Sequence, residues 1–462
     1  MDLSGVNVAV IGLGVSGVAA ARLAVERGGD VYVSDSREND AVTASGADLG
    51  RDGISVELGG HDIERLADAG IVVASPGISP DAPVLRALEE RGVRWISEPE
   101  LAARFFQGSL VAITGTNGKT STTLLVEHLL RASGIAAVAC GNVGVGLAPP
   151  ASDVARSGLP VDWIVLEMSS FQLAGVETFR PDIGVVTNLY SDHLDRYPSV
   201  DEYYADKAKI FGNASEDSVW VLPASDAAVR ELAGDAPGQR FHFGEGVGSH
   251  AFVDRGVMTL RSFGDIEALL PVAELPLLGA HNVENALAAS LIAHLAGAEA
   301  GGISAGLGSA RALPHRMKPV CERDGVLWVN DSKATNVSAT RSALLSLDRP
   351  VILLLGGKDK GEDFSDLRSA MEGRVRLVLA YGAAGPRAVR ELGEASPPQD
   401  DSIPSIRVEL IEDGLDMVVA RAAESTQRGD VVLLSPACSS FDMYESYEDR
   451  GRHFAELAEV VA

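Results

Sequence analysis

The chain has 462 residues, more than a single hydrophobic core organises, so we expect about three domains. Its formal net charge of −26 argues against nucleic acid or an anionic membrane surface as a partner, although glycine loops and a few basic residues can still bind anionic nucleotides. The cysteines lack C-x-x-C spacing, the N-terminus lacks a basic signal region, and no apolar run is long enough to span a membrane, so we expect a cytoplasmic protein without membrane insertion.

The first hundred residues follow the pattern of a nucleotide-binding α/β domain. A strand at 6–11 runs into the glycine-rich turn 12–17, a helix follows at 18–26, and a second strand at 30–34 ends at Asp35. Glycines permit the turn, a helix N-terminus favours a diphosphate, and the acidic residue can bind a ribose. The pattern suits both an NAD-type dinucleotide and a UDP-sugar. The shortness of the segment and the cation of Arg37 beside Asp35 weaken the first alternative.

A rigid turn follows another predicted strand of this segment, at 71–74. Ser75-Pro76-Gly77 stands where that strand ends, which is the edge at which open α/β sheets bind ligands. The turn is either a ligand contact or a simple connection to a helix at 82–91.

The strongest motif lies in the middle of the chain. A short apolar strand at 110–113 leads into Gly115-Thr116-Asn117-Gly118-Lys119-Thr120-Ser121, and an apolar helical pattern follows. This is the strand–loop–helix arrangement of a phosphate-binding loop, in which Lys119 reaches the β- and γ-phosphates and the Thr120 hydroxyl binds Mg²⁺. The loop is a shortened variant, because Ile113 occupies the position of the usual first glycine.

Polar residues follow the next predicted strands of the middle segment. Glu167 ends the strand 163–166, where a carboxylate can hold Mg²⁺ beside a phosphate loop. Asn142 is a turn former or a ligand contact, and His193, after the strand 183–187, is a structural residue or a ligand. Lys207, on a predicted helix at 201–211, has the pattern of a solvated charge.

Asn282 and Asn285 share one face of a later predicted helix and could read an adenine edge. After Pro314, predicted strands at 327–330, 351–355, 377–381 and 431–434 each end in a loop of small and charged residues. That succession is typical of an open α/β sheet with a ligand-binding edge.

We therefore expect an α/β protein with a Rossmann-like domain at 1–107, a central P-loop ATPase-like domain with a mostly parallel sheet at 108–313, and a Rossmann-like C-terminal domain at 314–462. Three functions are each consistent with part of this pattern. An NAD-dependent oxidoreductase would not use the phosphate loop. In a P-loop kinase or motor-type ATPase the outer domains would be interaction modules, and a non-catalytic binding protein would not need the polar residues at the strand ends.

In combination, the motifs resemble those of the Mur ligase family along essentially the whole chain. The resemblance rests on the stretches 115–120, Glu167, the pair His193 and Lys207, 281–285, 314–316 and 330–336. The stretches 167–173 and 435–442, with the absence of an Asp-Asn-Pro-Arg signature, favour the family member that adds D-glutamate.

The resemblance implies ATP-dependent amide bond formation. ATP phosphorylates the carboxylate of UDP-N-acetylmuramoyl-L-alanine, and the amine of D-glutamate then displaces the phosphate. It also implies two Mg²⁺ sites that involve Thr120, Glu167, His193 and Lys207, with Lys207 modified by CO₂ to a carbamate and Lys209 as the competing lysine. We expect a monomer whose partners are these small molecules.

The resemblance assigns further residues to the three substrates. For ATP these are Gly115, Thr116, Asn117, Gly118, Lys119, Thr120, Ser121, Asn282, Asn285, Arg316, Asp331 and Lys333. For the uridine-nucleotide substrate they are Val15, Ser16, Asp35, Ser36, Arg37, Ser75 and Asn142, and for D-glutamate they are His193, Thr335, Lys360, Ser440 and Tyr447. Domain closure about a hinge at 313–314 is expected to assemble the site.

Overall fold

The computed structural model describes residues 2–144, 146–194, 196–262, 265–393 and 406–461. The chain falls into two compact units. The first comprises Met1–Leu189, Asp201–Pro271 and Ala286–Gly306, and the second comprises Tyr190–Val200, Val272–Asn285 and Leu307–Ala462. The expected boundaries of three domains therefore stay a prediction.

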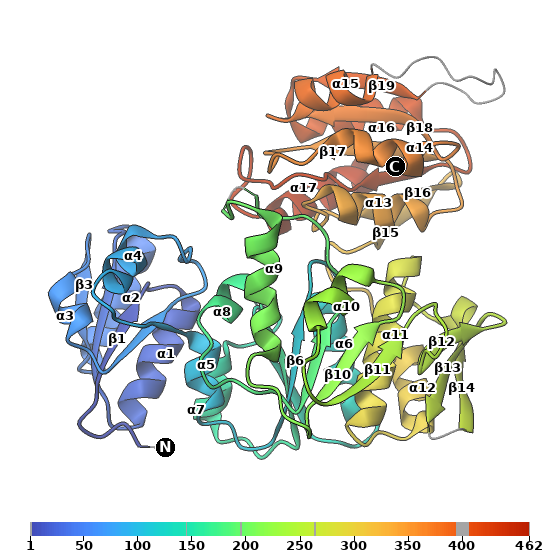
Figure 1. The fold of residues 1–462 in the computed structure, drawn as a ribbon. Helices are drawn as coiled ribbons and strands as arrows, with labels where there is room; N and C mark the ends of the chain where they lie inside the picture. Colours follow the sequence, from blue (N-terminus) through green and yellow to red (C-terminus); the bar gives the residue numbers. More distant parts are fainter. Residues whose placement is uncertain (1, 145, 195, 263–264, 394–405, 462) are drawn as a thin grey trace. The chain divides into compact units, whose positions relative to one another are not determined.

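The N-terminal part of the first unit is a parallel sheet whose described residues form five strands in the order β3-β2-β1-β4-β5 (Figure 1). The strands are β1 (Asn7–Ile11), β2 (Asp30–Asp35), β3 (Ser55–Leu58), β4 (Ile71–Ala74) and β5 (Ile96–Ser97). The helices are α1 (Val15–Glu26), α2 (Asp40–Arg51), α3 (Ile63–Ala67), α4 (Pro83–Glu89) and α5 (Glu98–Ala103). Apolar residues of α1, α2 and α5 pack in one core cluster with the strands, and those of α3 and α4 pack in another. Two helical layers thus enclose the sheet and leave its carboxyl edge for ligands.

The rest of the first unit is built on a sheet of nine described strands, in the order β14-β13-β12-β11-β10-β9-β6-β8-β7. The strands are β6 (Ser109–Thr114), β7 (Ala137–Gly141), β8 (Trp163–Glu167), β9 (Ile183–Val186), β10 (Val219–Pro223), β11 (Gln239–Phe243), β12 (Ala251–Asp254), β13 (Val257–Ser262) and β14 (Asp265–Pro271). In the order of the sheet, neighbouring strands from β7 through β8, β6, β9, β10 and β11 to β12 pair in parallel. The pairs β12–β13 and β13–β14 are antiparallel. The mostly parallel central sheet is confirmed, with an antiparallel edge that the sequence did not reveal.

The helices that accompany this sheet include the one that follows the phosphate loop. They are α6 (Lys119–Ala132), α7 (Ala151–Ser157), α8 (Ser170–Ala174), α9 (Val200–Ala208), η1 (Lys209–Phe211), α10 (Ala227–Ala233), α11 (Ala280–Leu295) and α12 (Ala300–Ser309). The 3₁₀ turn η2 (Val272–Glu274) and the start of α11 belong to the second unit. The helix expected at 201–211 is α9 followed by a 3₁₀ turn, η1, so it tightens at its C-terminal end.

The second unit contains a sheet whose described strands follow the order β15-β16-β20-β17-β18-β19. They are β15 (Lys318–Arg323), β16 (Val326–Asn330), β17 (Val351–Gly356), β18 (Val375–Tyr381), β19 (Arg407–Ile411) and β20 (Val431–Leu434), and β15 alone among these pairs antiparallel. The helices are α13 (Val337–Leu345), η3 (Phe364–Leu367), α14 (Arg368–Met371), α15 (Gly385–Gly393), α16 (Gly414–Ser425) and α17 (Tyr447–Val461). Apolar residues of α13, η3, α14 and α15 form one core cluster with the strands, and those of α16 and α17 form the other. The expected Rossmann-like C-terminal domain is confirmed.

Candidate active site

The loop between β6 and α6 has the conformation that a phosphate cradle requires. Gly118 precedes α6 with a φ of +82°, and Gly115 has a φ of +138°, so both adopt backbone geometry that favours glycine. A Cβ on Gly115 would lie 2.0 Å from Thr187 Oγ1, so this position has no room for a side chain. The backbone amides at the start of α6 remain the natural donors for phosphate oxygens.

Two residues that the sequence analysis missed fix this loop from the end of β9. Thr187 Oγ1 donates to the carbonyl of Asn117 at 2.6 Å, and Asn188 Nδ2 donates to the same carbonyl at 3.1 Å. Asn188 Oδ1 accepts from the Asn117 amide at 2.9 Å. Because β9 is the parallel neighbour of β6, their position directly after a buried strand was the available signal.

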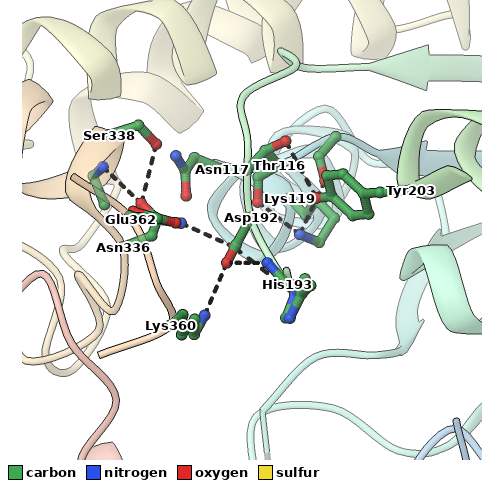
Figure 2. Close-up of polar contacts among 12 residues, drawn as sticks. Thr116, Asn117, Lys119, Asp192, His193, Tyr203, Asn336, Ser338, Lys360 and Glu362 are labelled. Carbon is green, nitrogen blue, oxygen red and sulfur yellow. Dashed lines mark hydrogen bonds and ion pairs between the residues drawn. The ribbon is translucent and has the colours of Figure 1, made fainter. Parts of the chain in front are cut away.

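Lys119 is the first residue of α6, and its side chain folds back over the preceding phosphate loop. Its Nζ donates to the carbonyls of Thr116 at 2.9 Å and Gly115 at 3.1 Å (Figure 2). Thr120 is buried on the first turn of α6. The cation and the hydroxyl predicted for phosphate and metal binding therefore both lie at the loop.

Glu167 ends β8 beside the loop strand, in register with Ile113 of β6 and Gly141 of β7. Its Oε1 accepts from Asn142 Nδ2 at 3.2 Å, so Asn142 lies against the predicted metal ligand. Its Oε2 is buried and has no hydrogen-bond partner among the described residues. A buried carboxylate oxygen without a partner is costly, and a divalent cation would satisfy it, so the residues present fit Mg²⁺.

The structure also separates the two competing lysines on α9 and η1. Lys207 is buried, and its Nζ donates to the Gly115 carbonyl at 2.7 Å and lies 4.6 Å from the centroid of the Tyr203 ring. Tyr203 Oη in turn donates to Thr116 Oγ1 at 3.2 Å (Figure 2). Lys209 instead donates to the Ala174 carbonyl and pairs with Asp206, with its side chain 44% exposed. Lys207 is thus the lysine at the phosphate loop.

In the second unit, Lys360, Asn336 and His193 form a polar cluster around the buried carboxylate of Asp192. Asp192 pairs with Lys360 Nζ at 2.9 Å and accepts from Asn336 Nδ2 at 3.0 Å and from the His193 amide at 2.8 Å (Figure 2). Burial opposes ionisation of Asp192, but the charges of Lys360 and His193 and these hydrogen bonds outweigh it and hold the pKa of its carboxyl well below the usual range. The ion pair with Asp192 holds the side chain of Lys360, a predicted D-glutamate ligand, in a defined position.

Next to this cluster, the side chain of Glu362 contacts the N-terminus of α13. Its Oε2 accepts from the Val337 amide at 2.6 Å, and Asn336 Oδ1 accepts from the Ala339 amide at 2.8 Å, so two side chains cap the helix. Burial raises the pKa of Glu362 to about 7, and the negative charge of Asp192 adds to this effect. The two caps hold the turn that carries Thr335, which is half-buried immediately before them.

The loop after β20 carries the remaining predicted D-glutamate residues. Ser440 is buried, and its Oγ has no hydrogen-bond partner in the described part of the chain. Tyr447, at the start of α17, has Lys333 Nζ 4.0 Å from its ring centroid. The phenol ring therefore lies beside a residue that the sequence assigned to ATP.

The side chain of Arg450 connects the loops at the carboxyl edge of the C-terminal sheet. It is fully buried and donates to the carbonyls of Ser332, Gly356, Cys438 and Ser439 and to Ser332 Oγ. Gly356 is the last residue of β17, and the other three follow β16 or β20. Among the described residues it forms no ion pair, so its five donors serve loop carbonyls and one hydroxyl. Sequence reasoning missed Arg450 because nothing in its surroundings distinguishes it from a surface arginine on α17.

The residues of the second unit that are predicted to bind the nucleotide lie at the start of α11, before β15 and after β16. Asp331 is buried and accepts from the Met317 amide and from Ser435 Oγ, and burial raises its pKa to about 7. Arg316 lies near enough to His281 to act with burial in lowering the pKa of that imidazole to about 4. Asn285 Nδ2 donates to Asn282 Oδ1 at 3.4 Å, so the two predicted adenine contacts face each other on α11.

At the carboxyl edge of the N-terminal sheet, six of the seven predicted uridine-nucleotide residues gather: Val15, Ser16, Asp35, Ser36, Arg37 and Ser75. Asp35 accepts from the Leu13 amide at 2.8 Å and from the backbone amide, Nε and Nη2 of Arg37. Burial opposes its ionisation, but these bonds outweigh burial and lower the pKa of Asp35 to about 2. Asp35 therefore holds the glycine turn and Arg37 in place, and its contact with the nucleotide stays a prediction.

Family models of the Mur ligases match three successive segments of the chain. They are the MurD-like N-terminal domain at residues 6–97, the Mur ligase middle domain at 113–293 and the Mur ligase glutamate ligase domain at 315–438. A UDP-N-acetylmuramoylalanine--D-glutamate ligase of Acidobacterium capsulatum is 42% identical over 99% of this chain and 97% of its own length. The chain belongs to the Mur ligase family. Proteins of the same name from Salinibacter ruber and Koribacter versatilis are 42% and 37% identical to this Mur ligase over at least 97% of each chain.

Solved structures of other Mur ligases share the fold of this Mur ligase. UDP-N-acetylmuramate-alanine ligase MurC of Thermotoga maritima has a TM-score of 0.59 at 18% identity, covering 99% of this chain and 100% of that one. MurF ligase of Thermotoga maritima, in complex with ADP, has a TM-score of 0.60 at 16% identity and covers 100% of this chain and 96% of that one. Membership of the family removes the oxidoreductase, the kinase or motor ATPase and the non-catalytic binding protein from the alternatives.

The described residues of this Mur ligase bear on two remaining expectations, membrane insertion and metal binding. None of the helices that the structure describes is both long enough and apolar enough to cross a membrane. Within the same residues, no three His, Cys, Asp or Glu side chains form a ready metal site. A metal at Glu167 would therefore need further oxygens from Thr120, water or substrate phosphates.

Proposed function

We propose that this Mur ligase uses ATP to join D-glutamate to UDP-N-acetylmuramoyl-L-alanine, with ADP and phosphate as products. The observation that carries the proposal is the match, over nearly the whole chain, to relatives named for this reaction, with 42% identity to the proteins of Acidobacterium capsulatum and Salinibacter ruber. The reaction is a step of peptidoglycan precursor synthesis, and we place it in the cytoplasm, where it would serve cell-wall formation, cell shape and cell division.

The chemistry follows from the poor reactivity of a carboxylate. Transfer of the γ-phosphoryl group of ATP to the carboxylate of the L-alanyl residue gives an acyl phosphate, whose phosphate is a good leaving group. The amine of D-glutamate attacks the acyl carbon, and inorganic phosphate leaves as the amide forms. Lys119 and the amides of residues 115–121 hold and neutralise the phosphates, which is the main contribution a protein makes to phosphoryl transfer.

Thr120 and Glu167 would hold one Mg²⁺ beside the phosphate loop, and His193 with Lys207 belong to a second proposed site. Bound Mg²⁺ supplies positive charge that orients the phosphates and stabilises the charge that develops during transfer. The partnerless Oε2 of Glu167 supports the first site. For the second, the support is the buried position of Lys207 at the Gly115 carbonyl.

The second site requires a change in the charge of Lys207. As a carbamate, formed from the amine and CO₂, its side chain would present anionic oxygens in place of a cation. We expect protein incubated with ¹³C-bicarbonate to show a carbamate carbon resonance that Lys207→Ala abolishes and Lys209→Ala keeps. A resonance that survives in Lys207→Ala would contradict the assignment.

D-glutamate is assigned to the second unit, where Lys360, Thr335, Ser440, Tyr447 and His193 are expected to contact it. A dicarboxylate needs cations and hydroxyl donors, and Lys360 and Ser440 provide both types. The ion pair with Asp192 at 2.9 Å would hold Lys360 in place before the amino acid binds.

The proposal is tested by ATP-dependent ligation with purified UDP-N-acetylmuramoyl-L-alanine. We expect an amide product and phosphate release with D-glutamate and none with L-glutamate, D-alanine or L-lysine. Lys119→Ala should abolish the reaction, whereas Lys209→Ala, whose side chain is directed away from the loop, should keep it. Phosphate release at full rate without D-glutamate would refute the proposal.

A further inference from the structure

The segment 440–444, between β20 and α17, is a tight turn that begins at Ser440, a predicted D-glutamate residue. The amides of Met443 and Tyr444 both donate to the Ser440 carbonyl, at 3.1 and 2.8 Å. Arg450 holds the two residues before the turn through their carbonyls. Because backbone bonds join the two ends of the turn, the position of Ser440 depends on what holds Tyr444.

Apolar packing contributes little to the middle of this turn. The side chain of Phe441 is 70% exposed, and that of Met443 is 38% exposed. A segment with few buried apolar contacts opens easily unless polar contacts hold it. Asp442 supplies one such contact, because its Oδ2 accepts from the Ala383 amide at 3.0 Å.

Tyr444 supplies the second contact and connects the turn to two helices. Its ring packs against the core cluster to which α16 and α17 contribute. Its Oη forms a hydrogen bond of 2.8 Å with His453 Nδ1 on α17, and His453 Nε2 lies 3.4 Å from Asp416 Oδ1 on α16. The side chain of Asp416 is 65% exposed, so the ion pair is the weaker of the two links.

The phenol of Tyr444 stays protonated at neutral pH. Burial raises the pKa of Tyr444 to about 12, and the negative charge of Asp416 adds to this effect. A protonated phenol can both donate and accept a hydrogen bond. The bond to His453 therefore forms whichever ring nitrogen carries the proton, and whether the imidazole is neutral or charged.

We propose that Tyr444 and His453 are positioning residues for D-glutamate, which hold the turn so that the Ser440 hydroxyl meets the amino acid. This inference rests on the proposed function, which assigns D-glutamate to Ser440. Ser440 Oγ is buried and has no hydrogen-bond partner among the described residues, so a bound ligand would satisfy it. That ligand is held well only if the hydroxyl stays in one place.

Steady-state ligation kinetics test this role with variants that remove single groups. Tyr444→Phe keeps the ring and removes the hydroxyl, and we expect the KM for D-glutamate to rise by about three- to tenfold, the value of one hydrogen bond, with kcat and the KM for ATP unchanged. His453→Ala should have a similar effect. The double variant should not exceed the larger single effect, because both changes remove the same bond. His453→Gln, whose amide can bond the phenol, should recover part of the loss.

The matched control is Tyr32→Phe, which removes a tyrosine hydroxyl bonded to Glu57 in the N-terminal sheet. It should leave the KM for D-glutamate unchanged. Hydrogen exchange followed by mass spectrometry should show faster exchange of the Met443 and Tyr444 amides in Tyr444→Phe than in wild type, without any substrate, and no such change in the control.

The outcomes separate the inference from the proposed function. An active wild type with an unchanged KM for D-glutamate in folded Tyr444→Phe, with additive effects in the double variant, or with unchanged exchange of the turn would overturn the inference alone. A wild type that makes no amide from D-glutamate would refute the proposed function and, with it, the role in binding.

Discussion

Arg450 shows how much of the amino-acid site depends on one side chain that touches none of the proposed substrates. Its guanidinium reaches the loops after β16, β17 and β20 at once, and those loops carry Thr335, Lys360 and Ser440. A planar fork of five donors can satisfy several carbonyls together, and a lysine ammonium cannot.

Replacement of Arg450 by lysine should therefore disturb binding of the amino acid. We expect Arg450→Lys to raise the KM for D-glutamate at least about tenfold and to reduce the free energy of unfolding by about 2–4 kcal/mol, because loop carbonyls lose their donors. The matched control is Arg452→Ala, whose side chain is 63% exposed. Chemical denaturation and ligation kinetics measure both effects. Equal KM values in Arg450→Lys and wild type would contradict this role.

Thr187 provides a second test at the scale of one residue. Its hydroxyl donates to the Asn117 carbonyl of the phosphate loop at 2.6 Å. We expect Thr187→Val, which keeps the shape of the side chain, to raise the KM for ATP by about three- to tenfold while leaving that for D-glutamate unchanged. Thr426→Val removes a hydroxyl that bonds Ala423 at the end of α16 and should change neither constant.

At the scale of elements, the contact between α5 and α7 contains a buried acid. Glu98 is fully buried on α5, and its Oε1 accepts from the Ser152 amide of α7 at 2.5 Å. Burial raises the pKa of Glu98 to about 7. Since the unfolded chain has the lower pKa, the folded state binds the proton more tightly. The stabilisation from the protonated acid is fully present below about pH 4.5 and is lost as the pH rises through about 7.

Glu98→Gln should remove this pH dependence. Glutamine keeps the acceptor for Ser152 but cannot ionise, so we expect the variant to exceed wild type in the free energy of unfolding by up to about 3 kcal/mol at pH 8 and to match it near pH 4.5. Urea denaturation across this pH range measures the difference, and the exposed Glu90→Gln serves as control. A difference that does not vary with pH would show that Glu98 ionises normally in the folded protein.

Most helices and strands could be predicted from the sequence. The contacts between residues far apart in the chain could not. The run Gly118-Lys119-Thr120 after an apolar strand identifies the phosphate loop because local chemistry alone requires it. The spacing of Lys207 alone indicated a solvated charge, and only the family resemblance favoured it over Lys209. The physical reason lies in the fold, because α9 turns the Lys207 side chain toward Gly115. Asp192 was missed because Asn336 and Lys360, its partners, lie 144 and 168 residues away.

At the scale of the whole molecule, the residues assigned to ATP are divided between the two compact units. Those of 115–121 belong to the first, whereas Asn282, Asn285, Arg316, Asp331 and Lys333 belong to the second. One nucleotide that contacts both sets must draw them together, with the segment at 313–314 as the expected hinge.

We therefore expect ATP with UDP-N-acetylmuramoyl-L-alanine to reduce the radius of gyration in small-angle X-ray scattering. Lys119→Ala, which weakens the hold on the phosphates, should show a smaller reduction at the same concentrations. An unchanged radius of gyration for wild type at saturating ligand would argue against closure.

Arg450 also bears on how an anionic amino acid approaches a protein with a formal net charge of −26. Its guanidinium donates to carbonyls and a hydroxyl and forms no ion pair among the described residues. This buried cation lies behind the strand-end loops, and salt screens the repulsion from distant negative charges more than it screens interactions at close range. Added salt up to physiological strength should thus speed the arrival of glutamate rather than slow it.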